Sequence, residues 1–311
     1  WRRGKREDPR EHYRLAAEAF DQAVALMPTD AVLLNNQGLL HQSLAMLAEE
    51  SGKDASAEHE AALAAFSKAC GLAPGMLEAW CNVGLTALAL AELRGDRGED
   101  PLPWYDKAED ALARVVAADR SRTVAWRQLG KARKARGDCL WSRLGDPTKD
   151  YDLARRAHES ALSAGPASIE DFLGLGEAVQ ALARYRLSRG EDPAKDCEAA
   201  MAAYGRGIEA FGPTVALLNN RANTRLILFD WHAGRGEETG PDLERALQDL
   251  DAASRADPSV WQVDLNRGVV LDRLGRLEES VQALEKARAA SSGNQAVEAI
   301  HFARFLVEHG G

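Results

Sequence analysis

The chain has 311 residues, of which 45% are hydrophobic and 28% charged, and it carries a net charge of −9 with a sequence pI of about 5.4. This composition is typical of a folded protein with roughly two domains' worth of material. The acidic charge argues against nucleic acid as a partner, because phosphate binding needs a basic face. No apolar run is long enough to cross a membrane, so no membrane partner is expected.

The N-terminus and the cysteines indicate the cellular setting. The first ten residues, WRRGKREDPR, contain no apolar core, so we expect no signal peptide. This start is unusual for a natural chain, so a fragment of a longer chain is one interpretation. The four cysteines, Cys70, Cys81, Cys139 and Cys197, form no CxxC pair and have no histidine at metal spacing. We therefore predict free thiols in a reducing, cytoplasmic compartment.

A repeat of 46 residues organises the chain. Six segments align without gaps, and each ends at a small residue: Gly38, Gly84, Gly130, Gly176, Ala222 and Gly268. A second register begins at an alanine in every unit: Ala16, Ala62, Ala108, Ala154, Ala200 and Ala246. Four residues later stands a residue that is large in most units: Phe20, Phe66, Leu112, His158, Tyr204 and Leu250. Small and large residues at this helical spacing predict two antiparallel helices per unit that approach closely.

In chain order, the register predicts a partial repeat over residues 1–30, five long repeats over 31–257, one short repeat over 258–293 and a C-terminal capping helix over 294–311. In the first full repeat we expect one helix near 31–50 and a second near 55–72. Loops of the RGxDP kind separate the two helices, as at Gly98 to Pro101, Gly145 to Pro147 and Gly190 to Pro193. The loop aspartate is expected to cap the second helix, with proline at its first position. These aspartates also suggest calcium, but each loop offers too few oxygen ligands.

The repeat resembles the tetratricopeptide repeat (TPR) family, whose pattern is W-x2-L-G, then A-x3-F, then P. Trp126-x2-Leu129-Gly130 matches the first part, and Ala16-x3-Phe20 and Ala62-x3-Phe66 match the second. The resemblance covers nearly the whole chain and implies an all-α, right-handed superhelical solenoid of antiparallel helix hairpins. The usual period is about 34 residues, so we predict that both helices are longer by roughly six residues.

Arrays with long helices and RGxDP loops look like those that follow serine/threonine kinase domains in large bacterial signalling proteins. No kinase motif occurs here, nor a Walker loop, HExxH, GxSxG or GxGxxG. His158 lies in the large core position, so a packing role is favoured over that of a catalytic base. The glycines of Leu173-Gly174-Leu175-Gly176 are assigned to helix packing. We therefore expect no enzyme activity, no cofactor and no metal.

The TPR resemblance implies that the first helices line a concave binding face. Nine residues at these positions are the predicted peptide site: Asn35, Leu39, Asn82, Leu85, Arg127, Lys131, Lys134, Asn219 and Asn223. Val32, Cys81 and Leu88 are also expected on this face. The first two units are apolar, the third is basic, and asparagine amides can grip a peptide backbone. The clamp that some TPR proteins form around a terminal carboxylate is incomplete, because Asn35 and Leu39 stand in two of its positions. A solvated basic helix is the alternative for Arg127, Lys131 and Lys134.

The predicted function is a protein-interaction scaffold that binds a peptide or protein with hydrophobic and acidic features, as a module of a larger bacterial signalling protein. Two alternatives stay open. The first is an array that associates with itself through its apolar ends, since a solenoid needs polar caps to remain monomeric. The second is a non-catalytic accessory domain of an enzyme.

Overall fold

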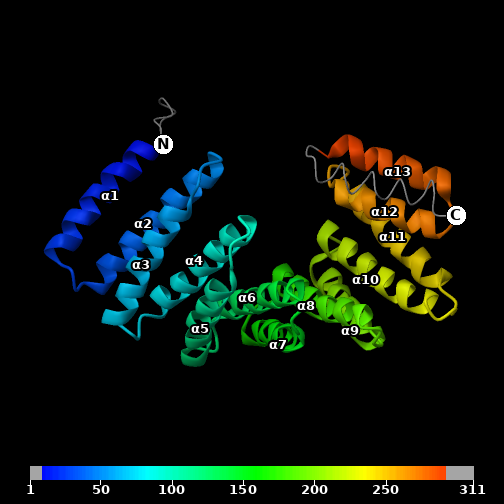
Figure 1. Cartoon of the computed structure of the whole chain (residues 1–311), viewed down its shortest axis with the longest axis horizontal. Coiled ribbons are helices and arrows are strands. Elements are labelled where there is room, and N and C mark those ends of the chain that lie inside the picture. The colour runs from blue at the N-terminus through cyan, green and yellow to red at the C-terminus, as the bar shows by residue number, and fades with distance from the viewer. Residues whose placement is uncertain (1–8, 292–311) are drawn as a thin grey trace. The chain divides into compact units, whose positions relative to one another are not determined.

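The computed structural model describes residues 9–291 (Figure 1), and this part of the chain contains thirteen helices and no strand. The predicted all-α class is therefore confirmed. The helices are α1 Pro9–Leu26, α2 Ala31–Glu50, α3 Ser56–Leu72, α4 Leu77–Asp96, α5 Leu102–Ala118, α6 Thr123–Ser142, α7 Thr148–Ala164, α8 Ile169–Ser188, α9 Ala194–Phe211, α10 Val215–Ala233, α11 Gly240–Ala256, α12 Trp261–Arg273 and α13 Leu277–Ala290. The capping helix predicted for 294–311 lies outside the described residues.

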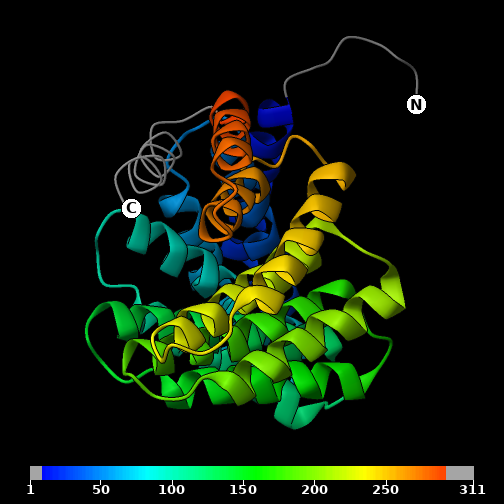
Figure 2. The ribbon, with the colours of Figure 1, turned by 90° about the vertical axis from the view of Figure 1, so that its right-hand side faces the viewer.

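The chain divides into two compact units. Unit 1 comprises Trp1–Gly145 with Ser163–Gly165, and unit 2 comprises Asp146–Leu162 with Pro166–Gly311. In unit 1, α2 pairs with α3 and α4 with α5, and each second helix also contacts the first helix of the following hairpin. Unit 2 repeats this pattern in the hairpins α8–α9, α10–α11 and α12–α13 (Figures 1 and 2). Each unit is therefore a stack of helix hairpins.

The helix boundaries follow the spacing of the sequence. The first helices begin at 31, 77, 123, 169, 215 and 261, and the second helices of the five long hairpins at 56, 102, 148, 194 and 240, so that each start lies 46 residues after the one before. The predicted helices near 31–50 and 55–72 are observed as Ala31–Glu50 and Ser56–Leu72.

The prediction that each helix is longer by roughly six residues is correct for the first helix and wrong for the second. The first helix of a long hairpin has 19 or 20 residues against 13 in α12. The second helix of a long hairpin has 17 or 18 residues, against 14 in α13, which belongs to the last and shortest hairpin. Most of the added length therefore lies in the first helices.

Small residues let the helices of a hairpin approach closely. A Cβ atom placed on Gly38 would lie 2.5 Å from the Phe66 ring, and one on Gly176 would lie 2.3 Å from the Tyr204 ring. The second-helix alanines face the same contacts and are fully buried: Ala62, Ala108, Ala154, Ala200 and Ala246. The predicted pairing of a small first-helix residue with a large second-helix residue is confirmed. His158 also packs as predicted, because it is buried and a Cβ atom on Gly174 would meet its ring at 2.1 Å.

The loop between the two helices of a long hairpin has a fixed hydrogen-bond pattern. An aspartate side chain accepts a hydrogen bond from the backbone N–H two residues later. Asp54 accepts from Ser56 at 2.9 Å, and Asp192 accepts from Ala194 at 2.9 Å. Asp100 with Leu102 and Asp146 with Thr148 do the same. The aspartate therefore ties down the start of the second helix. However, Pro101 and Pro193 occupy the N-cap itself and not the first helical position as predicted.

The same loops contain a left-handed residue just after the first helix. Gly52, Gly98, Gly190 and Gly236 have φ between 65° and 72°. In the third long repeat this position is Leu144, with φ of 61°, and not the neighbouring glycine, Gly145. Leucine is strained there, because its Cβ atom crowds the backbone in the left-handed conformation.

Candidate functional site

The first helices of unit 1 form one continuous layer. Asn82 on α4 donates its side-chain N–H to Asn35 Oδ1 on α2 at 3.0 Å, and Gln42 Nε2 donates to Thr86 Oγ1 at 2.8 Å. Between α4 and α6, Lys131 Nζ lies 2.8 Å from Glu92 Oε1. The predicted site residues of α2, α4 and α6 therefore belong to one face, which we call the first-helix face.

The α2 part of the first-helix face is apolar and exposed. Leu39 exposes 42% of its surface, and it lies seven residues from Val32 and from Met46, which expose 58% and 60%. A spacing of seven keeps three side chains on one side of a helix. An exposed apolar row of this kind marks an interaction surface more often than an isolated leucine does. The sequence analysis did not assign Met46 to this face, although its spacing of seven residues from Leu39 can be seen in the sequence.

The α4 part is less open. Leu85 is half-buried and Leu88 is only 4% exposed, so the expectation that Leu88 faces a ligand was wrong. Leu88 belongs to the core because it lies one turn from the buried Gly84, which contacts the next helix. Cys81 is half-buried, and burial raises the pKa of its thiol. This part of the face offers one accessible apolar side chain, Leu85.

The asparagines have their own partners. Asn35 and Asn82 bind each other, and in unit 2 Asn266 donates to Asn219 Oδ1 at 2.9 Å. Since an amide has two donor hydrogens and an acceptor oxygen, one such bond leaves hydrogen-bonding capacity at each pair. Asn223 is half-buried on α10. Asn219 and Asn223 belong to unit 2, while the other seven predicted site residues belong to unit 1.

The predicted basic group is locally compensated. Lys131 pairs with Glu92, and Lys134 Nζ lies 2.7 Å from Asp138 Oδ2 on the same helix. The Lys131 side chain is 56% exposed and that of Lys134 is 32% exposed, so these pairs are weak and exchange with solvent ions or with another carboxylate. Arg127 is half-buried on the same helix.

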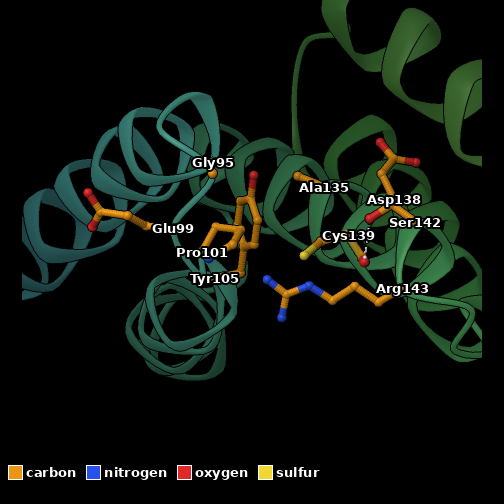
Figure 3. Close-up of a pocket in the computed structure, with 10 residues that line it drawn as sticks. Gly95, Glu99, Pro101, Tyr105, Ala135, Asp138, Cys139, Ser142 and Arg143 are labelled. Atoms are coloured by element: carbon orange, nitrogen blue, oxygen red, sulfur yellow. Dashed lines mark hydrogen bonds between the residues drawn. The ribbon is translucent and has the colours of Figure 1, made fainter.

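A pocket of about 450 Å³ lies in unit 1 where the α4–α5 loop meets the end of α6 (Figure 3). Pro101 and Tyr105 are buried at its base, and Cys139 on α6 and Arg143 just after this helix reach toward Tyr105. Gly95 and Asp138 also line this cavity, which we call the Tyr105 pocket. Burial raises the pKa of Tyr105 to about 12 and, in a smaller measure, that of the Cys139 thiol. Both side chains are therefore neutral near pH 7.

Other chemistry is sparse in the part of the chain that the structure describes. Between residues 9 and 291, no group of three His, Cys, Asp or Glu side chains is arranged to hold a metal ion. The four cysteines are free thiols. None of the described helices is both long and apolar enough to span a membrane.

Stacked hairpins with this small-to-large packing define a TPR-like helical array, and solved structures share the fold. A tetratricopeptide repeat protein from Parabacteroides merdae is 13% identical to this chain, with a TM-score of 0.58. The match covers 95% of this chain and 93% of the other protein. The Cut9–Hcn1 hetero-tetramer of APC/C matches at 14% identity over 94% of this chain and 45% of its own, with a TM-score of 0.52. A monomeric IFIT1 mutant solved with Gppp-AAAA matches at 12% identity over 97% of this chain and 62% of its own, with a TM-score of 0.50.

No protein-family model matches the sequence, and no curated protein matches it. At these identities the structural likeness defines the fold alone.

Proposed function

We propose that this chain is a protein-interaction scaffold that binds an apolar segment of a partner protein on the first-helix face of unit 1. The exposed row of Val32, Leu39 and Met46 on α2 carries this proposal. All three are exposed large apolar residues, and they lie on a helix that packs against α3. Burying them under a partner removes apolar surface from water at about 25 cal/mol per Å².

The other predicted residues have defined roles in this proposal. Leu39 and Leu85 hold the hydrophobic anchor of the partner, and Asn35 and Asn82 bind its backbone through the amide capacity that their mutual bond leaves unused. Asn219 and Asn223 offer a second amide surface on unit 2.

Acidic residues of the partner are expected to compete with the existing carboxylates at Lys131 and Lys134. Because Glu92 and Asp138 already balance these cations, the acidic contact contributes to association rate and specificity more than to affinity. Arg127 lies one turn from Lys131 and belongs to the same contact.

We further propose that the chain is a non-catalytic, cytoplasmic module of a larger bacterial signalling protein. Support comes from the four free thiols and from the likeness of the RGxDP loops and long helices to arrays found beside bacterial kinase domains.

Site-specific photo-cross-linking tests the proposal. A photoreactive amino acid at position 39 is expected to capture a partner from the source cell. The same residue at position 277, where Leu277 on α13 is 50% exposed, is the matched control. Leu39→Gln combined with Met46→Gln should weaken the isolated complex at least tenfold while leaving the helical content unchanged. Equal affinity of the double variant and the native chain rules out this face.

Charge reversal tests the acidic contact separately. Arg127→Glu with Lys131→Glu should slow association and flatten its dependence on salt, because such steering acts within a Debye length of about 8 Å at physiological ionic strength. An unchanged salt dependence means that the partner does not use this group. Light scattering of the purified chain distinguishes a foreign partner from self-association, since a concentration-dependent dimer lost in Leu39→Gln would assign the face to a second copy.

A further inference from the structure

The Tyr105 pocket has small side chains at two of its three repeat positions, Gly95 and Cys139. In the sequence these positions fall at the end of one first helix, at the start of the second helix, and at the end of the next first helix. Their occupants in the first four long repeats are Glu49, His59 and Leu93; then Gly95, Tyr105 and Cys139; then Trp141, Tyr151 and Tyr185; then Leu187, Cys197 and Trp231. Among these four sets only the second combines glycine with cysteine, so its three side chains have the smallest total volume.

A later repeat shows what kind of group this place accepts. The counterpart of Cys139, 92 residues later, is Trp231, and the counterpart of Arg143 is Arg235. In unit 2 the Arg235 guanidinium lies over the Trp231 ring at 5.1 Å from its centroid. This distance is within the roughly 6 Å at which a cation and an aromatic face attract each other. In unit 1 the corresponding arginine is Arg143, and the position equivalent to Trp231 is Cys139, so the chain supplies no indole ring there.

The lining of the pocket has the chemistry that an aromatic ring requires. Pro101 and Tyr105 give a buried apolar base, and the Cys139 sulfur points to Tyr105 in Figure 3. Sulfur and guanidinium groups both make favourable contacts with aromatic rings. The volume of about 450 Å³ lies within the range of about 300–1,000 Å³ found for ligand pockets.

We infer that the Tyr105 pocket binds an aromatic side chain, tryptophan or tyrosine, presented by the partner protein, with its ring stacked on Arg143. This inference rests on the proposed function, since it names a second contact point of the same partner. Arg143 remains paired with Asp100 at 2.8 Å, which holds the guanidinium at the mouth of the pocket. Arg235 is similarly held by Glu237 at 2.8 Å while it stacks on Trp231, so pairing and stacking are compatible.

The first experiment uses the whole chain and small probes, and needs no known partner. N-acetyl-tryptophanamide should bind in ligand-observed NMR at least fivefold more tightly than N-acetyl-leucinamide. Cys139→Trp, which copies Trp231, should fill the pocket and weaken the tryptophan probe at least tenfold, whereas Leu277→Trp, at an exposed position of α13 outside the pocket, should stay within twofold of the native chain. Gly95→Trp, which copies Trp141, provides a second way to fill the pocket if Cys139→Trp fails to fold. Equal binding of both probes, or binding that survives both filled variants, overturns the inference.

The nature of the ligand is tested in the same assay. Free tryptophan carries two charges that a residue within a chain lacks, and it should bind more weakly than the doubly blocked amide. Tighter binding of the free amino acid would point to a small metabolite and would overturn the assignment to a protein segment.

The affinity of the partner captured by cross-linking at position 39 is then measured in two variants, to distinguish this inference from the proposed function. Loss of its binding in both Leu39→Gln and Cys139→Trp supports the two together. Loss in Leu39→Gln alone overturns the aromatic contact and leaves the scaffold proposal intact. Loss in Cys139→Trp alone places the partner at the Tyr105 pocket and removes the first-helix face from the proposal.

Discussion

Arg143, just after α6, and Asp100, in the loop between α4 and α5, form an ion pair of 2.8 Å within unit 1. The relationship recurs at the repeat spacing of 46 residues, because Arg97 pairs with Asp54 in the preceding hairpins. In unit 2 the Arg189 charge adds to the hydrogen bonds from Thr148 that lower the pKa of Asp146. Each aspartate thus has two roles: it ties down the start of its own second helix and it meets an arginine from the next hairpin.

The first prediction concerns pH and Asp54. Backbone and side-chain hydrogen bonds from Ser56, followed by one from Arg97, lower the pKa of Asp54 from an ordinary 3.8 to about 2. A carboxylate with a depressed folded-state pKa stabilises the fold above its unfolded pKa, and this contribution is lost as the pH falls through the folded pKa. The native chain should therefore be more stable than Asp54→Asn at pH 5, and the difference should shrink between about pH 4 and pH 2.

Denaturant titrations of both proteins across this pH range measure the difference. Asp110, which lies on α5 away from the loops, supplies the comparison variant Asp110→Asn. A difference between the native chain and Asp54→Asn that is constant from pH 5 to pH 2 would contradict the role of the charge.

The second prediction tests the close approach of α2 and α3. Gly38→Ala should destabilise the chain by ~1–3 kcal/mol, the cost of overpacking, because the added methyl would lie 2.5 Å from the Phe66 ring. This cost exceeds the gain of about 1 kcal/mol that alanine brings to a helix interior. The fifth long repeat pairs Ala222 with Leu250 in the same core cluster. Adding Phe66→Leu should therefore reduce the cost of Gly38→Ala without abolishing it, because a Cβ atom on Gly84 would still lie 2.5 Å from Leu112.

A double-mutant cycle by chemical denaturation measures this coupling. If Gly38→Ala costs the same free energy of unfolding with Phe66 and with leucine at position 66, the two residues do not share the contact.

The repeat made most of this architecture predictable, because each small or large side chain at a 46-residue interval has one packing role. Trp80 and Trp126 show the strength of such a signal: each donates its indole N–H to a backbone carbonyl six residues earlier, at 3.0 Å in both cases. Individual site residues were harder to place. Leu88 was assigned to the binding face although it is buried, because a helix with two packed sides leaves only a narrow exposed row.

The pairing of charges and the Tyr105 pocket depend on neighbouring hairpins, and a single helix does not reveal them. Lys131 meets Glu92 only because α4 and α6 are adjacent. The arginine–aspartate pairs of the loops could have been predicted from the sequence, because an arginine recurs every 46 residues, at Arg97, Arg143, Arg189 and Arg235. The pocket required a comparison of three positions across four repeats.

The third prediction concerns the buried alanine position. Ala200→Leu should destabilise the chain by ~1–3 kcal/mol, because Ala200 is fully buried within a cluster that includes Tyr204 and Leu217. Ala216→Leu on the neighbouring α10 is the control, since Ala216 is exposed. Thermal unfolding should shift for the first variant and not for the second. Equal melting temperatures for Ala200→Leu and the native chain would mean that this position is not a close helix contact.

The last prediction concerns Leu144, which has a φ of 61° and is 97% exposed. A left-handed conformation costs an ordinary residue roughly 1–2 kcal/mol, whereas glycine adopts it freely. Glycine also costs about 0.5–1 kcal/mol through the greater freedom of the unfolded chain. Because the exposed leucine side chain has almost no burial to lose, Leu144→Gly should stabilise the fold by about 0.5–1 kcal/mol. The reverse change, Gly190→Leu at the equivalent φ of 72°, should destabilise it by a similar amount, since no neighbouring atom restricts a Cβ there and only the backbone is strained. Urea denaturation of the two single variants gives both values. A destabilised Leu144→Gly variant would show that the leucine side chain makes a contact worth more than its backbone strain, which would turn attention to this loop as a binding surface.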